Sequence, residues 1–186
     1  MTEFWQYVIS GLSTGAIYAI VALGLALIYR STRILNFAHG DMATAGTFCA
    51  FMLMGTQLPF GVIFVVALIF GALLAMTFYF CVLLPAQRRE ANQLSQIILT
   101  LGLGLILQGL ISYFGGTEPQ DFPFPLSEIE IYNIGPLVIS QLSVGTIAMA
   151  LIVSLLLYLL VQKTRIGLAM RATSENLPAA QTMGIP

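Results

Sequence analysis

Long apolar runs alternate with short polar segments along the whole chain. The runs carry no charge and contain none of the eight prolines. Each reaches or approaches the roughly 17–25 apolar residues that a helix needs to cross a bilayer. They cover residues 4–29, 42–58, 60–84, 93–114 and 139–161. The pattern predicts an all-α fold, a polytopic transmembrane helix bundle of about five spans in a single domain over 1–186.

The first two runs need separate comment. No basic residue precedes the run over 4–29, so we interpret it as a retained span and not as a secretory signal peptide. The run over 42–58 is at the short limit for a span, and either a full span or a re-entrant segment fits it. A re-entrant segment would change the count of spans and reverse the side on which the N-terminus lies.

The composition agrees with lipid as the solvent. Of all residues 58% are hydrophobic and 8% are charged, and the mean hydropathy is +0.92, whereas soluble domains are about 25% charged. Seven basic and eight acidic residues leave no cationic surface for nucleic acid. Cys49 and Cys81 lie in apolar runs and the chain has one histidine, which argues against a disulfide framework or a Cys/His metal site.

The basic residues predict the orientation, because short loops rich in Lys and Arg stay in the cytoplasm. All seven follow the first, third or fifth run: Arg30, Arg33, Arg88, Arg89, Lys163, Arg165 and Arg171. The connection over 115–138 instead has four acidic residues, four prolines and no basic residue, so we expect an irregular extracytoplasmic loop. This arrangement places the N-terminus outside.

A polar segment separates the first two runs. In one interpretation it is a cytoplasmic turn, in which Asn36 forms a side-chain turn, Gly40 allows a sharp bend and Asp41 caps the following helix. In the other, residues 34–41 enter the membrane as a broken helix whose polar groups line a pathway, since non-helical backbone at that depth occurs beside protein or a water-filled cavity. The residues themselves leave both interpretations open.

The segment over 164–186 is less apolar than the runs. A cap at Ser174 or Asn176, Pro178 in a first turn and Gly184 as a stop predict one short cytoplasmic helix. Its apolar positions recur every third residue, at Leu177, Ala180 and Met183. With few basic residues nearby, docking to a protein partner explains this helix better than binding to anionic lipid.

With these segments the chain resembles the permease subunits of branched-chain amino acid ABC importers, the Liv-type permeases. The likeness is carried by residues 15–29 of the first run, by the sequence Asn-Phe-Ala-His-Gly-Asp over 36–41 followed by Gly46, and by the residues over 167–172 and 179–185. The last of these is similar to the cytoplasmic coupling loop of ABC import permeases, whose short helix seats in the ATPase. Pro178 stands where that loop has Glu, so a salt bridge from that position is not expected. Permeases of this family are longer, and we expect the chain to be an N-terminal fragment that does not transport alone.

The resemblance implies a non-catalytic permease subunit of an ATP-driven importer in a bacterial-type plasma (inner) membrane. We expect the substrate pathway or its gate at Asn36, His39, Gly40, Asp41 and Gln108, and the contact with the ATPase at Arg171, Ala179, Ala180 and Gly184. The chain has no phosphate-binding loop, so ATP and Mg are expected on separate ABC ATPase subunits, with no cofactor in this chain. A second permease subunit, an extracytoplasmic solute-binding protein and membrane lipid are the other implied partners. The sequence does not separate branched-chain amino acids from other amino acids, urea or short amides.

Two other classes of function remain to be weighed. An ATP-independent channel or secondary transporter for a small polar solute such as urea would need no ATPase. The five runs contain no ionisable residue of the kind that drives ion coupling, and such a protein would have no use for a coupling loop. A membrane enzyme would need a converging set of catalytic groups, and His39 and Asp41 alone are too few to form one.

Overall fold

The computed structural model describes residues 2–116, 118, 122, 131–134 and 137–184. Within these ranges lie eight α-helices, one π-helical turn and one two-stranded hairpin. The chain forms two compact units. The first comprises residues 1–33 and 124–186, and the second comprises residues 34–123.

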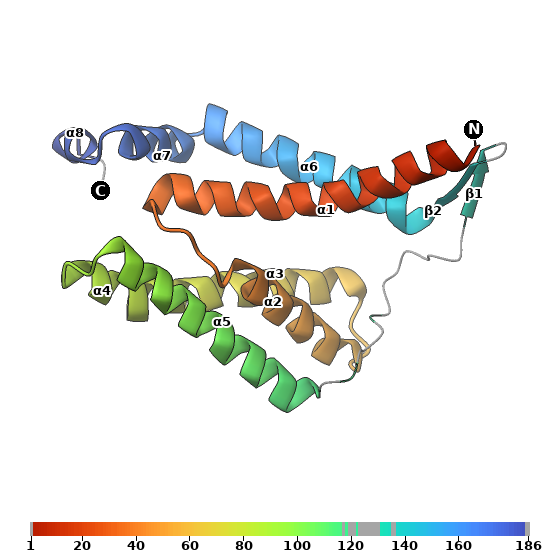
Figure 1. Cartoon of the computed structure of the whole chain (residues 1–186), viewed down its shortest axis with the longest axis horizontal. Coiled ribbons are helices and arrows are strands. Elements are labelled where there is room, and N and C mark those ends of the chain that lie inside the picture. Colours follow the sequence, from red (N-terminus) through yellow and green to blue (C-terminus); the bar gives the residue numbers. More distant parts are fainter. Residues whose placement is uncertain (1, 117, 119–121, 123–130, 135–136, 185–186) are drawn as a thin grey trace. The chain divides into compact units, whose positions relative to one another are not determined.

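In the first unit, two long helices lie side by side (Figure 1). They are α1 (Thr2–Thr32) and α6 (Gln141–Lys163). Between them in sequence, β1 (Ile131–Ile134) pairs antiparallel with β2 (Leu137–Ser140). Ser140 ends the hairpin and caps α6, because its hydroxyl accepts a hydrogen bond from the Ser143 N–H at 3.2 Å.

Two shorter helices follow α6 in the same unit: α7 (Arg165–Glu175) and α8 (Leu177–Thr182). The Thr164 hydroxyl caps α7 by accepting from the Gly167 N–H at 3.1 Å. Gly167 is buried at the corner, where an added Cβ would lie 2.5 Å from the carbonyl carbon of Val161 and closer still to two carbonyl oxygens. Only glycine therefore permits this close turn from α6 into α7.

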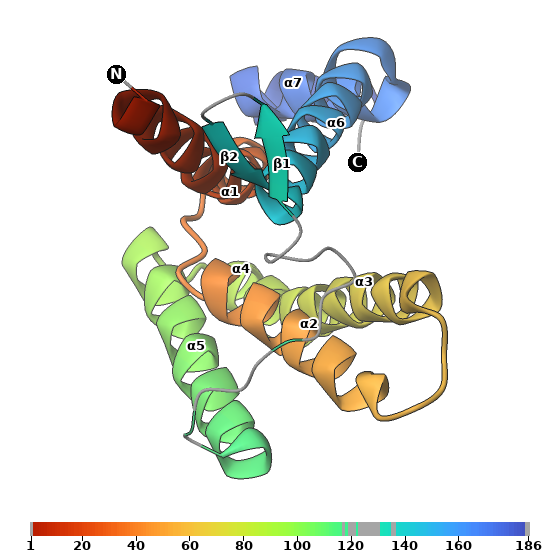
Figure 2. The same cartoon turned by 90° about the vertical axis from the view of Figure 1, so that its right-hand side faces the viewer.

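The second unit packs α2 (His39–Met54) against both α3 (Phe60–Phe78) and α5 (Gln93–Gly115) (Figure 2). A π-helical turn, η1 (Tyr79–Leu83), and α4 (Leu84–Arg88) continue α3. Asn92 then caps α5, since its side-chain oxygen accepts from the Ser95 N–H at 2.8 Å.

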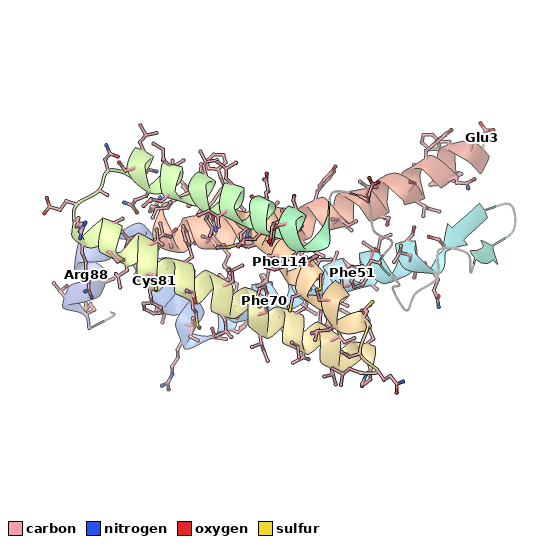
Figure 3. All side chains as sticks on the ribbon, turned by 90° about the horizontal axis from the view of Figure 1, so that it is seen from below. Glu3, Phe51, Phe70, Cys81, Arg88 and Phe114 are labelled. Atoms are coloured by element: carbon pink, nitrogen blue, oxygen red, sulfur yellow. The ribbon has the colours of Figure 1, made fainter. Side chains whose placement is uncertain are left out.

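In the part of the chain that the structure describes, four helical segments are long and apolar enough to cross a membrane: Glu3–Arg30, Phe60–Arg88, Gln93–Gly115 and Gln141–Lys163. Large apolar side chains project from them into the surroundings, as Phe70 and Phe114 do in Figure 3. Exposure of this kind suits a lipid solvent, in which the apolar faces of helices need no protein cover. The structure thus supports the predicted α-helical membrane bundle.

The elements differ from the predicted boundaries at three places. The second run forms a helix of 16 residues, about 24 Å long, that starts earlier and ends earlier than 42–58. The helix of the third run continues through Pro85 to Arg88. In a regular α-helix the ring of Pro85 would clash with the carbonyl four residues before it, and the π-helical turn includes that position. The hairpin lies partly in the connection over 115–138, where only an irregular segment was expected. The acidic residues Asp121, Glu128 and Glu130 of that connection lie outside the described residues.

Candidate functional site

A non-helical stretch, residues 34–38, leads into α2 in the second unit. The Asn36 side-chain oxygen accepts from the Ala38 N–H at 3.1 Å, which confirms the predicted side-chain turn. The Phe37 N–H donates to the hydroxyl of Thr100 on α5 at 3.2 Å. Ile34 and Ala38 are buried. The hydrogen bond therefore holds the stretch against α5, and two of its apolar residues are buried.

Small residues allow this close approach. Thr100 is fully buried, and its hydroxyl donates to the Ile97 carbonyl at 2.7 Å while it accepts from Phe37. One turn further along α5, Gly104 is buried, and an added Cβ there would lie 3.8 Å from the Cα of Ala38. A bulky residue at either position would separate the stretch from the helix.

Asp41 and Gln108 meet across α2 and α5. The Gln108 side-chain amide donates to the Asp41 carboxylate at 2.9 Å. An added Cβ on Gly104 would lie 2.5 Å from the other carboxylate oxygen, so the glycine provides the space for this side chain. Asp41 lies in the first turn of α2, where the partial positive charge of a helix N-terminus favours a carboxylate.

The structure corrects two details of the predicted turn. Asp41 does not cap α2: the cap residue is Ala38, which makes no side-chain capping bond. Gly40 makes no sharp bend, because α2 already begins at His39 and the chain turns at residues 37–38. The His39 side chain is half-buried, and the backbone N–H of His39 donates to the Asn36 backbone carbonyl at 3.2 Å. All five predicted pathway residues thus lie in one unit, and Gln108 joins the others through Asp41.

The second group of candidates lies on α7 and α8 in the first unit. The Asn176 side-chain oxygen accepts from the Ala179 N–H at 3.1 Å, which fits one of the two predicted caps, and Gly184 has a φ of 78° just after the helix. Ala179 is exposed and Ala180 is buried. The expected short helix is present as α8, and a further helix that was not expected, α7, precedes it; the extended conformation of Asn176 separates the two.

Arg171 lies on α7, the helix that precedes α8. One of its guanidinium nitrogens donates to the side-chain oxygen of Gln162 on α6 at 3.0 Å. Its Nε is buried and has no hydrogen-bond partner among the described residues. In this structure Arg171 therefore braces α7 against the end of α6.

Several residues around these sites were missed by sequence reasoning. Thr100 accepts the hydrogen bond from Phe37, Gly104 leaves the space for the Asp41 side chain, and Gly167 permits the close turn from α6 into α7. The corner had a usable signal, since a threonine three residues before a glycine at the end of an apolar run fits a helix cap. Thr100 and Gly104 gave none, because small residues are common throughout such helices.

Comparison with known proteins places the chain among transport proteins. A family model described as the permease component of branched-chain amino acid transport systems matches residues 7–186. The chain is 34% identical over 178 residues to the probable branched-chain amino acid transport permease protein LivH of Methanocaldococcus jannaschii, covering 89% of this chain and 53% of that protein.

Two bacterial relatives show the same pattern. One is the high-affinity branched-chain amino acid transport system permease protein BraD of Pseudomonas aeruginosa, 25% identical over 98% of this chain and 63% of its own length. The other is the corresponding LivH protein of Escherichia coli, 27% identical over 98% of this chain and 62% of its own length. The chain spans between about half and two thirds of the length of these relatives. No solved structure matches significantly.

Proposed function

The chain belongs to the family of permease components of branched-chain amino acid transport systems, and from this membership we propose that it forms part of the translocation pathway of an ATP-driven ABC importer for branched-chain or related amino acids. It is a multi-pass membrane protein, and in the proposal it lies in a bacterial-type inner membrane. ATP hydrolysis takes place on separate ATPase subunits. A second permease subunit and an extracytoplasmic solute-binding protein complete the importer.

The observation that carries the pathway proposal is the hydrogen bond between Asp41 and Gln108. An ionisable side chain beside apolar, membrane-capable helices is unusual and marks a functional site by default. A zwitterionic amino acid presents an ammonium and a carboxylate, for which a carboxylate and an amide are suitable partners. Asn36, His39 and Gly40 lie on the adjoining stretch and would line or gate the same pathway.

The coupling proposal depends on α8. This helix has a capped start at Asn176 and a stop at Gly184. Ala179 on the helix and Met183 just after it are exposed, while Ala180 is buried. A short helix with one small exposed face suits a groove on a partner protein. Arg171 would contribute by fixing α7, which leads into α8.

ATP-dependent uptake of leucine tests this proposal. The chain would be produced with its ATPase and partner subunits in membrane vesicles, and uptake would be measured with and without ATP. We expect Asp41→Asn and Gln108→Ala to reduce uptake at least tenfold while the ATPase subunits still co-purify. Thr47→Ala on α2 and Ser112→Ala on α5 are matched controls, because both side chains are exposed polar groups outside the proposed pathway.

The outcomes separate the alternatives. Uptake that needs no ATP would contradict the importer and support a channel or secondary transporter. ATP-driven uptake that Asp41→Asn and Gln108→Ala leave at the level of the controls would instead remove these residues from the pathway.

A further inference from the structure

Arg33 is the last residue of the N-terminal segment of the first unit, and its backbone and side chain are both unusual. Its φ is 60°, a left-handed conformation that residues other than glycine seldom adopt. Its guanidinium donates a hydrogen bond to the backbone carbonyl of Ser174, 141 positions along the chain. Unfavourable backbone conformations persist where the surrounding structure holds them, often at functional positions.

The carbonyl of Ser174 is well suited to receive this bond. Ser174 is the second-last residue of α7, and the last four carbonyls of a helix have no partner within it. The C-terminal end of a helix also carries partial negative charge, which attracts a guanidinium. Ser174 is buried, so the bond satisfies a carbonyl with little access to water.

The two ends of this bond lie next to the two candidate sites along the chain. Ser174 is followed by Glu175 and by Asn176, which caps α8. Arg33 is followed directly by residues 34–38, the stretch that carries Asn36 and leads to Asp41. A displacement of the α7–α8 segment would therefore act on the point at which the chain enters the pathway stretch.

We propose that Arg33 is a positioning residue that transmits movement of the ATPase-docking segment to residues 34–41 through its bond to Ser174. The proposal rests on the importer function proposed above. A purely structural Arg33 would hold the end of α7 equally in all states of the ATPase. A transmitting Arg33 makes the pathway stretch respond to nucleotide.

The test uses a reporter cysteine at Phe37, whose side chain is exposed, with Cys49 and Cys81 replaced by serine. The chain would be held in vesicles with its ATPase subunits, and the rate of thiol labelling would be measured without nucleotide and with ATP plus vanadate. With Arg33 present, we expect nucleotide to change the labelling rate at least twofold.

Substitutions at position 33 separate the side chain from the backbone. Arg33→Gly removes the hydrogen bond but suits the positive φ, so it removes the link without adding backbone strain. We expect it to abolish the nucleotide response while the ATPase subunits remain bound and active. Arg33→Lys, which offers a shorter and less extended donor, should give a reduced response. Arg30→Ala is the control, an exposed basic residue one turn earlier, and should leave the response intact.

Each result has one meaning. A full nucleotide response in both Arg33→Gly and Arg33→Lys would overturn the role of Arg33. If Arg33→Gly does not reach the membrane, the comparison of Arg33→Lys with Arg30→Lys decides, and equal responses overturn the proposal. Failure of the ATPase subunits to bind the chain with Arg33 in place would instead contradict the importer function itself.

Discussion

Gly104 provides a sharp test of the geometry around Asp41. Gly104→Ala adds a single methyl group, which would lie 2.5 Å from one Asp41 carboxylate oxygen, well inside the 3.4 Å at which ordinary contact begins. The carboxylate is the movable partner, so it must rotate. Since its other oxygen accepts the bond from Gln108, the rotation breaks that bond.

The size of the effect follows from two opposing contributions. A hydrogen bond to a charged group contributes about 1.5–3 kcal/mol, and the exposed position of this one favours the lower end, about 1.5 kcal/mol. Alanine in place of glycine stabilises a helix interior by about 1 kcal/mol. Gly102→Ala carries the same helix gain, and no atom lies within 4 Å of its Cβ position. The two variants should therefore differ by about 1.5 kcal/mol, or about tenfold in the unfolding equilibrium constant.

Unfolding in detergent by titration with sodium dodecyl sulfate measures this difference. The reactivity of Cys49, which is half-buried on α2, reports unfolding once the exposed Cys81 is replaced by serine. Repeating both substitutions in an Asp41→Ala background completes a double-mutant cycle. There the difference between Gly104→Ala and Gly102→Ala should vanish. Equal stability of the two variants with Asp41 present would show that the Gly104 methyl group does not break the bond between Asp41 and Gln108.

Three further predictions concern single contacts. Gly167→Ala should destabilise the α6–α7 corner by about 1–3 kcal/mol, since the methyl meets backbone carbonyls, and faster proteolysis of the segment after α6 would reveal it. Thr100→Val should lower the free energy of unfolding by about 1–3 kcal/mol, because it leaves the Phe37 N–H unpaired. Faster hydrogen exchange at the Phe37 amide would show the loss, and exchange unchanged from wild type would count against the bond. Asn176→Ala should lower the helicity of α8 by removing the cap on Ala179, a loss of about 1 kcal/mol measurable by hydrogen exchange, whereas Asn176→Asp should retain it.

The long helices could be predicted from the sequence because hydropathy alone determines them. An uncharged run free of proline and longer than a bilayer core has few other stable structures in lipid. The exact ends could not be predicted in the same way. The third run was expected to end at residue 84, but the π-helical turn before Pro85 lets the helix continue to Arg88.

The candidate site could be predicted in part. Asn36, His39 and Asp41 stood out because polar residues are rare in this chain, and the predicted turn at Asn36 is present. Their partners depend on which helix packs where, information that one sequence does not contain. Gln108 was a candidate without a known partner until α5 was seen to bring it to Asp41.

The role of Arg33 could not be predicted at all. It was counted as one of the basic residues that orient the chain, and its bond to Ser174 joins segments separated by four apolar runs. Long-range contacts of this kind leave no local pattern.

The most direct test of the central claim is labelling of a single cysteine at Thr182, an exposed position on α8, in sealed vesicles of known orientation. We expect labelling from the cytoplasmic side alone, and protection from labelling when the ATPase subunits bind. Labelling from the outside, or labelling from the cytoplasmic side that bound ATPase leaves unchanged, would contradict the assignment of α8 as the segment that couples this permease to its ATPase.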